Sequence, residues 1–170
     1  MMSAGLRKLM LTLHITASVG WLGAVVAYMA LAITVQTSTD NQTIRAAYIS
    51  LEPVTRYVIV PFSLAALFSG IVQSLGTSWG LLRHYWIIFK LMLTIFAVAV
   101  LMTYTPTVSQ MASAAADPTV STADLQTMGA GLPHAVGALI VLLITTFLSV
   151  FKPRGMTRYG WRQQRMRRTS

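Results

Sequence analysis

The chain has no cysteine and very few charged side chains. Its 170 residues include only four Asp or Glu, and charged residues make up 10% of the sequence, against roughly a quarter in ordinary soluble domains. Without cysteine there are no disulfides, no thiolate metal ligands and no thiol nucleophile. Any bound metal must therefore be held by nitrogen, oxygen or thioether sulfur. The sequence also lacks a glycine-rich phosphate loop and the H-E-x-x-H pattern of metal hydrolases.

Long apolar stretches take the place of the missing charge. Hydrophobic residues make up 55% of the chain, and the mean hydropathy is +0.63. A helix needs about 20 residues to cross the hydrocarbon core of a bilayer. Four stretches have about this length, at residues 9–35, 57–75, 86–104 and 135–151. The sequence therefore predicts an all-α membrane protein, a four-transmembrane-helix bundle in a single domain at 1–151, with a basic tail at 152–170.

Charges are sorted between alternate segments outside these spans. All four carboxylates, Asp40, Glu52, Asp117 and Asp124, lie between spans one and two or three and four, where only Arg45 and Arg56 are basic. The remaining segments collect the basic residues Arg7, Lys8, Arg83, Lys152, Arg154, Arg158, Arg162, Arg165, Arg167 and Arg168. Because Lys and Arg accumulate in cytoplasmic segments, we expect the N and C termini to be cytoplasmic.

The net charge of +9 comes largely from the tail. Basic clusters are also the footprint of nucleic-acid binding. These arginines, however, directly follow a membrane span, where anionic headgroups attract each basic residue by about 1 kcal/mol. We therefore expect the tail to contact the bilayer and its anionic lipid headgroups, and no nucleic acid.

The segment before the fourth span has its own local signals. Asp117 and Pro118 should end the third helix, and Ser121 to Asp124 fits the S-x-x-[DE] capping box that begins a helix. We expect a short extramembrane helix here, interrupted before the membrane by glycines at 129 and 131 and by Pro133.

One face of the first span carries polar and aromatic side chains. His14, Trp21 and Tyr28 recur every seven residues, which keeps them on one helix face, and Ser18 lies between the first two. An ionisable residue within the bilayer is rare and is a functional candidate by default. Together these residues suggest an interior cavity or a cofactor face.

Small residues mark a second pattern in the first span. Gly20 and Ala24, and Gly23 and Ala27, are each four apart, the small-xxx-small pattern that lets membrane helices approach closely. Either the second span packs there, with Gly70 facing it, or another protein does. A homodimer and a partner membrane subunit are the two alternatives for such a protein.

His14 and His134 are the candidate metal ligands. His14 lies in the inner half of the bundle and His134 at the outer mouth of the fourth span, roughly 20 Å apart along the membrane normal by the helical rise. Metal–imidazole bonds are near 2 Å, so the two cannot easily share one metal. For a haem held by His14, the second ligand remains open between His84, a second copy of His14, an exogenous group, and the thioethers of Met10 and Met92.

A cofactor at His14 would have polar neighbours in the inner half. Trp21, Ser18, Gln73 and Lys90 complete this candidate site, and Lys90 can pair with a haem propionate. The stretch Lys8-Leu9-Met10-Leu11-Thr12 recurs as Lys90-Leu91-Met92-Leu93-Thr94. If the two helical hairpins descend from one ancestral pair, we expect Lys90 to extend to the inner membrane surface, as long Lys side chains do near helix ends.

Two sequence patterns carry a family resemblance. These are His14 followed by Trp21-Leu22-Gly23, and the segment from Trp79-Gly80 through Arg83-His84 to Lys90-Leu91. In them the chain resembles a bacterial group of four-helix integral membrane proteins of unknown function and, more distantly, the copper-resistance D type. The nearer group implies an inner-membrane protein without an assigned activity. The distant one implies copper or haem handling, although His134, Met111 and Met128 are too dispersed for an obvious copper site.

Two functions of different classes remain open. No Asp or Glu lies within a span, so acid–base catalysis and proton-coupled transport lack their usual carboxylates, and we do not expect an enzyme. The first function is a structural or accessory protein of the inner membrane, in which His14 is hydrogen-bonded to Ser69, Gln73 or Thr94. The second is a b-type haem or other redox-cofactor protein that uses His14.

Overall fold

A computed structural model describes residues 2–77 and 80–169, with the backbone alone for 167–169. These residues form helices and no strand. The elements are α1 (Ala4–Thr37), α2 (Asn41–Val54), the π-helix η1 (Thr55–Ile59), α3 (Val60–Gly76), α4 (Tyr85–Ala116), α5 (Thr122–Thr127), the short 3₁₀ segment η2 (Gly129–Gly131), α6 (Leu132–Phe151) and α7 (Arg158–Thr169).

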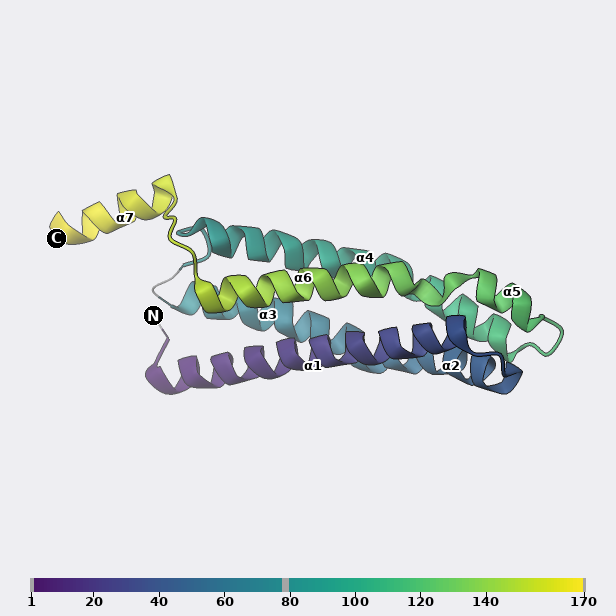
Figure 1. Ribbon diagram of the computed structural model, residues 1–170. Coiled ribbons are helices and arrows are strands. Elements are labelled where there is room, and N and C mark those ends of the chain that lie inside the picture. The colour runs from purple at the N-terminus through teal and green to yellow at the C-terminus, as the bar shows by residue number, and fades with distance from the viewer. Residues whose placement is uncertain (1, 78–79, 170) are drawn as a thin grey trace.

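Four of the described helical stretches are long and apolar enough to cross a membrane. They are Ala4–Thr37, Asn41–Gly76, Tyr85–Ala116 and Gly129–Phe151, so the prediction of an all-α protein with four helices that could span a membrane is confirmed. Both chain ends lie at one end of the bundle, which we call the termini end, and α5 lies at the other, the α5 end (Figure 1).

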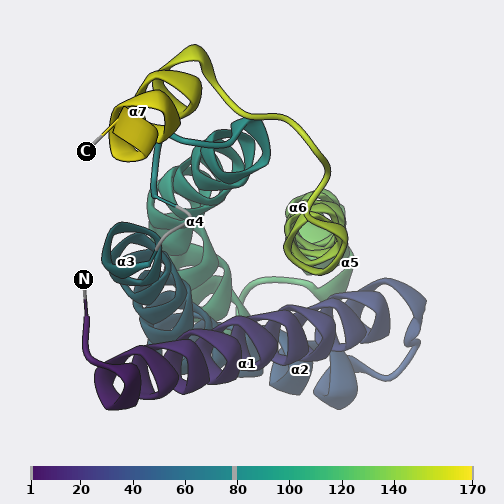
Figure 2. The same cartoon turned by 90° about the vertical axis from the view of Figure 1, so that its left-hand side faces the viewer.

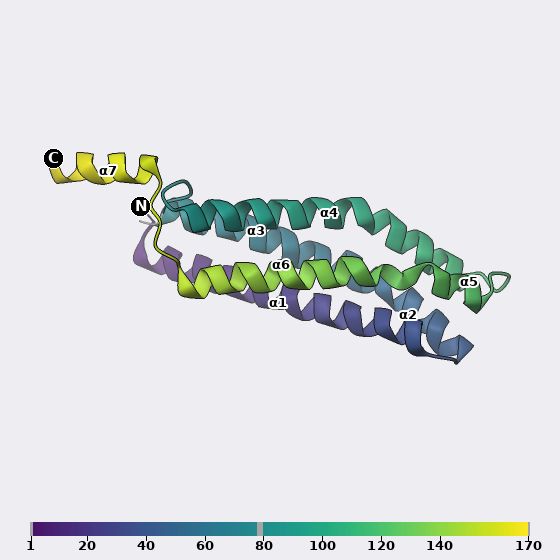
Figure 3. The ribbon, with the colours of Figure 1, turned by 45° about the horizontal axis from the view of Figure 1, so that its top comes forward.

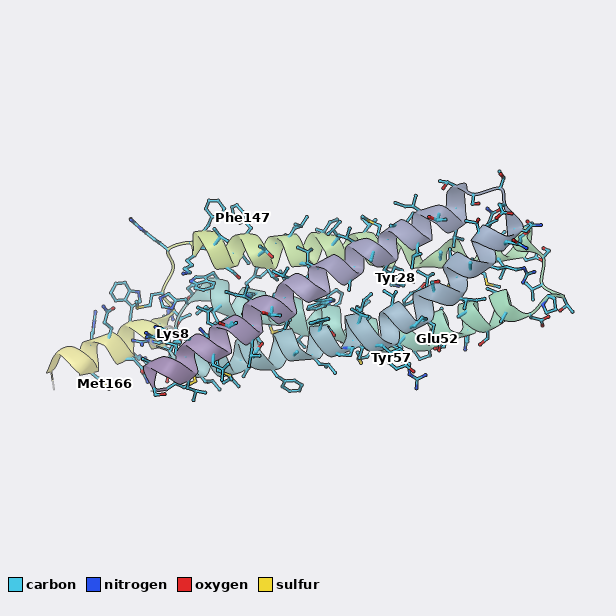
Figure 4. All side chains as sticks on the ribbon, turned by 90° about the horizontal axis from the view of Figure 1, so that it is seen from below. Lys8, Tyr28, Glu52, Tyr57, Phe147 and Met166 are labelled. Carbon is cyan, nitrogen blue, oxygen red and sulfur yellow. The ribbon has the colours of Figure 1, made fainter. Side chains whose placement is uncertain are left out.

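Many large apolar side chains are exposed on the outside of the bundle. Phe68, Phe96 and Phe147 are each more than half exposed, and Figure 4 shows Tyr57 and Phe147 pointing away from the bundle. In water such a surface would be an aggregation liability. Facing hydrocarbon, these side chains lie in their preferred solvent.

The helices are longer than a bilayer requires. At 1.5 Å per residue, the 34 residues of α1 span about 51 Å, whereas a hydrocarbon core is about 30 Å thick. The side chains that are most completely buried lie toward the α5 end, and they include Val35, Ile44, Tyr48, Leu51, Val108 and Leu125. The bundle is therefore packed most tightly at this end.

The segment between spans one and two is helical, which the sequence did not predict. Asp40 caps α2 by accepting from the Thr43 backbone N–H at 2.9 Å and from its hydroxyl at 2.6 Å, and these bonds hold the pKa of the Asp40 carboxyl below its usual value. Ile44, Tyr48 and Leu51 then form one buried face of α2. The polar composition of this segment hid an amphipathic helix.

The second span does not break at its prolines. Pro53 lies inside α2, and Pro61 lies in the first turn of α3. Between them the chain widens into the π-helix, where the Val60 N–H donates to the Thr55 carbonyl five residues earlier. A π-helix changes the hydrogen-bond register without ending the helix, so α2, η1 and α3 continue as one membrane-spanning rod.

The predicted capping box and interruption before span four are confirmed. The Ser121 hydroxyl accepts from the Asp124 N–H at 3.1 Å and donates to its carboxylate at 2.6 Å, at the start of α5. Residues 129–131 then form a left-handed turn, with φ of +74° at Gly129, +45° at Ala130 and +67° at Gly131. This turn separates α5 from α6.

Two buried tyrosines close the turn onto the bundle. The Tyr48 hydroxyl donates to the Leu125 carbonyl at 2.6 Å and accepts from the Ala130 N–H at 3.1 Å. The Tyr28 hydroxyl donates to the Ala130 carbonyl at 3.2 Å. Backbone groups that a left-handed turn leaves without helical partners are thereby satisfied in a buried place.

Arg45 explains one exception to the charge sorting. Its guanidinium donates to the carbonyls of Ala115 and Asp117 at 2.8 Å each, and also to that of Val120. These groups lie at the end of α4, where unpaired carbonyls and the helix dipole favour a cation. Arg45 therefore fastens α2 to the α4–α5 connection.

The tail is partly helical and is attached to the bundle. The Thr157 backbone N–H donates to the Arg83 carbonyl at 2.9 Å, its hydroxyl donates to the Leu82 carbonyl at 2.7 Å, and that hydroxyl also accepts from the Gly160 N–H at 3.1 Å. Beyond this anchor α7 extends away from the termini end, as Figures 1 and 3 show. The sequence analysis treated 152–170 only as a basic tail.

Helix α1 crosses the bundle diagonally, as Figures 2 and 4 show. Its small residues divide between two environments. A Cβ at Gly20 would lie 2.8 Å from the Phe62 ring of α3, and Ala24 is buried within the chain. Gly23 and Ala27 are exposed. The alternative in which the second span packs on α1 is confirmed at Gly20.

The left-handed turn yields a stability prediction. A Cβ at Gly131 would lie 2.5 Å from the Tyr104 hydroxyl and 2.8 Å from that of Tyr28, whereas a Cβ at Gly129 would meet nothing within 4 Å. Gly129→Ala should lower the free energy of unfolding by about 1–2 kcal/mol, the cost of a side chain in the left-handed backbone conformation. Gly131→Ala should add an overpacking cost of about 1–3 kcal/mol. Unfolding in detergent measures both, and equal losses would contradict this turn geometry.

Candidate functional site

The candidate site at His14 is a chain of hydrogen bonds between helices. His14, on α1, places its Nδ1 atom 3.1 Å from the Ala66 carbonyl oxygen and 3.1 Å from the Ser69 hydroxyl, both on α3. Its Nε2 atom lies 3.4 Å from Nζ of Lys90 on α4. Both ring nitrogens therefore face polar groups of other helices.

Lys90 carries the chain of bonds on to the fourth span. Its Nζ donates to the Ser149 hydroxyl at 2.7 Å, and that hydroxyl donates to the Thr145 carbonyl at 2.6 Å. Ser69, His14, Lys90 and Ser149 thus join α3, α1, α4 and α6, and we call these four residues the polar cross-link. Each of the four spans contributes one side chain to it.

The partners determine how the imidazole is protonated in a neutral ring. A carbonyl oxygen can only accept, so Nδ1 carries the hydrogen and donates to Ala66. Nε2 then presents its lone pair to the Lys90 amine, which donates. The nitrogen that a metal would need is therefore already used as a hydrogen-bond acceptor.

Gly70 makes room for the His14 ring. A Cβ at this position would lie 3.0 Å from Cε1 and 3.4 Å from Nδ1 of His14. The sequence suggests that Gly70 faces the small residues of α1. Its place in the structure is against His14, one residue after Ser69, so the Ser-Gly pair supplies both a hydrogen-bond partner and space.

Lys90 does not extend to the inner membrane surface, and that prediction was wrong. Its amine is partly buried between His14 and Ser149. The sequence offers no carboxylate nearby, because all four lie at the α5 end on or beside α2, α4 and α5. The acceptors that hold Lys90 inside are neutral, and sequence patterns for ion pairs could not reveal them.

Gln73 and Ser18 belong to the same half of the bundle but not to the polar cross-link. The side-chain oxygen of Gln73 is buried and has no hydrogen-bond partner among the described residues. Ser18 is half-buried. Of the three hydrogen-bond partners suggested for His14, Ser69 is the one that bonds to it, and Gln73 and Thr94 do not.

Trp21 lies apart from His14, although the heptad spacing keeps them on one face. Trp21 is 3% exposed, and together with Tyr28 it lines a cavity of about 370 Å³ toward the α5 end. His14 is not among the residues that line this cavity. The predicted face thus divides into a polar region at His14 and a cavity wall at Trp21 and Tyr28.

His134 is also at the cavity. It lies in the first turn of α6 and stacks on the Tyr104 ring, with centroids 3.9 Å apart and planes 16° from parallel. His134 and His14 share no bonding partner. Among the described residues, no group of three or more His, Asp or Glu side chains is placed to hold a metal ion.

Sequence reasoning missed Ser149 and Tyr104. Ser149 lies near the end of an apolar helix, where a single serine is a common packing residue, and only the position of Lys90 reveals its role. Tyr104 was assigned as the last residue of a span, and its contact with His134 depends on how α4 and α6 meet. Trp79, which is part of the resemblance quoted above, lies outside the described residues.

Comparison with other proteins adds no assignment. The chain matches no protein-family model, no curated protein and no solved structure. The resemblance to four-helix membrane proteins and to the copper-resistance D type therefore stays a prediction.

The polar cross-link should contribute measurably to stability. A hydrogen bond between membrane helices contributes about 0.6 kcal/mol on average and up to about 1.7. His14→Phe, which keeps a ring of similar size, should therefore cost about 1–3 kcal/mol, and Ser149→Ala about 0.6. In a double-mutant cycle, His14→Phe and Lys90→Met should couple by about 0.5–2 kcal/mol. Unfolding in detergent provides each value.

A matched control tests whether these losses are specific. The Thr146 hydroxyl donates only to the Leu142 carbonyl of its own helix, so Thr146→Ala should change stability very little. A coupling of zero between His14 and Lys90, or a loss in Thr146→Ala as large as in Ser149→Ala, would contradict a polar cross-link.

Proposed function

We propose that the chain is a structural or accessory protein of the bacterial inner membrane, in which His14 holds the spans together. The observation that carries this proposal is the occupation of both imidazole nitrogens, Nδ1 by Ala66 and Ser69 and Nε2 by Lys90. A buried polar group is stable in a membrane when its hydrogen bonds are satisfied within the bundle. The polar cross-link satisfies His14 without any cofactor.

A b-type haem or another redox cofactor at His14 is the second candidate function. What favours it is the cationic Lys90 beside His14, since an amine can pair with a propionate, together with the unpaired oxygen of Gln73 in the same half. Iron ligation would require Nε2 of His14 to exchange Lys90 for the metal. That exchange would break the polar cross-link, so the two functions exclude one another at this atom.

The termini end is proposed to face the cytoplasm. Arg7, Lys8, Arg83, Lys152 and the arginines of the tail all belong to this end, and the four carboxylates belong to the α5 end. This arrangement agrees with the enrichment of Lys and Arg in cytoplasmic segments. We propose that the basic tail is attracted to anionic lipid headgroups from its anchor at Thr157.

A membrane partner is part of the accessory function. The exposed residues Gly23 and Ala27 permit close approach of another helix to α1. A partner subunit or a second copy of the chain is proposed to pack there, beside the apolar surface that otherwise faces lipid.

The visible absorption spectrum distinguishes the two functions. Protein purified in mild detergent, and the same protein after incubation with haemin, should show no reduced-minus-oxidised haem bands that depend on His14. A Soret and an alpha band that are present in the natural sequence and lost in His14→Ala would establish the haem function instead. His134→Ala serves as the matched control, because it removes an imidazole that stacks on Tyr104 and shares no partner with His14.

Membrane orientation is tested with reporter fusions. A reporter that is active only in the cytoplasm should be active when fused after Ser170 and inactive when inserted between Pro118 and Thr119. A periplasmic reporter should give the opposite result. Activity of the periplasmic reporter after Ser170 would contradict the proposed orientation.

A further inference from the structure

A cavity in the α5 half of the bundle is a feature that the polar cross-link does not explain. It measures about 370 Å³ and lies between α1, η1, α4 and α6. Ligand pockets in proteins typically measure about 300–1,000 Å³ and are mostly apolar with a few polar groups. This cavity has the size and the composition of a small-molecule site.

Local backbone irregularities surround the cavity. Two residues of the π-helix, Thr55 and Ile59, line it, and so do Pro133 and His134, which directly follow the left-handed turn. A single π-helical turn within an α-helix is frequently found at functional sites. Small residues on the walls, Ala97, Gly137 and Ala138, also keep the space open.

Two polar groups at the cavity retain capacity for a ligand. Among the described residues, the Tyr104 hydroxyl has only the Met111 sulfur as a partner, at 3.9 Å, and a thioether is a weak acceptor. His134 stacks on Tyr104 and forms no hydrogen bond within the described parts of the chain. An oxygen atom placed beside these rings would accept bonds that the protein itself leaves unformed.

The rest of the lining defines what can enter. Trp21, Tyr28 and Phe96 supply flat aromatic walls, and no charged side chain occurs among the described residues that line the cavity. Phe96 is 63% exposed on the surface that faces lipid. The ligand must therefore be neutral, soluble in the bilayer, suited to stacking and equipped with an acceptor oxygen.

We propose that this cavity binds a neutral, lipid-soluble ring compound that carries carbonyl oxygens, of the quinone class. One ring carbonyl accepts from the Tyr104 hydroxyl or from the His134 ring, and the ring itself lies against the aromatic walls. An acyl chain would fill the same space but would leave Tyr104 and His134 unpaired. The quinone class satisfies both requirements.

Binding is measured through tryptophan fluorescence of the full chain in detergent. A short-chain ubiquinone is titrated as the probe, and we expect saturable quenching because Trp21 forms part of the cavity wall. Trp21→Phe should remove the saturable part and leave the quenching of the other tryptophans. Tyr104→Phe should weaken binding about fivefold, as expected for one lost hydrogen bond.

Two glycines provide a matched pair for the decisive test. A Cβ at Gly137, on the cavity wall, and a Cβ at Gly23, on the exposed side of α1, would each meet nothing within 4 Å. Gly137→Leu should fill the cavity and weaken binding at least about tenfold, whereas Gly23→Leu should leave binding unchanged. Gly137→Ala adds one methyl group and should have an intermediate effect in a protein that folds normally.

Several results would overturn the proposal. These are quenching that does not saturate, quenching of equal strength in Trp21→Phe, and binding that Gly137→Ala and Gly137→Leu leave unaltered. Oleic acid is the competing probe for an acyl chain. If oleic acid binds with sensitivity to Gly137→Leu and displaces the quinone while Tyr104→Phe has no effect on either, the cavity is a lipid site instead.

Discussion

Within a bilayer the hydrophobic effect does not drive helices together, because lipid tails solvate apolar side chains as well as a protein core does. This constraint determines how the bundle is held together. Between lipid-embedded helices the association must come from packing and hydrogen bonds. The chain meets this need in two places. In the half near the termini, one polar side chain from each span joins the polar cross-link of Ser69, His14, Lys90 and Ser149. At the α5 end the helices extend further than the bilayer requires, and there a well-packed core forms around Tyr48.

The two places differ in what they leave for function. The polar cross-link uses both nitrogens of His14, so its geometry favours a structural role. The cavity near the α5 end leaves Tyr104 and His134 with bonding capacity, and the described residues that line it carry no Asp, Glu, Lys or Arg. The histidine that the sequence singles out first therefore serves the architecture, and the one at the mouth of the fourth span lies where a ligand can reach it.

The membrane-spanning architecture was predictable because it rests on length, apolar composition and charge sorting, which are properties of the chain itself. The same holds for the capping box at Ser121, a local signal. The helix at 41–54 was missed because its polar residues and Pro53 resemble a loop, and its buried face depends on the end of α1 and on α5. The contact of Lys90 with His14 was beyond prediction because it depends on how the helices are rotated against one another. Sequence spacing gives the face of a helix but not its partner.

The π-helix at Thr55–Ile59 sets the relative rotation of the two halves of the second span. Each residue of an α-helix turns the chain by about 100°, so one residue more or fewer in this segment would rotate everything after it by about that angle. Before the π-helix, Tyr48 would keep its hydrogen bonds to Leu125 and Ala130. Downstream, Ser69 and Gly70 would swing away from the imidazole of His14 toward hydrocarbon. The π-helix thus sets the rotation that lets Tyr48 contact the turn after α5 while Ser69 and Gly70 contact His14. Single-residue insertions and deletions in this span should therefore be tolerated less well than substitutions.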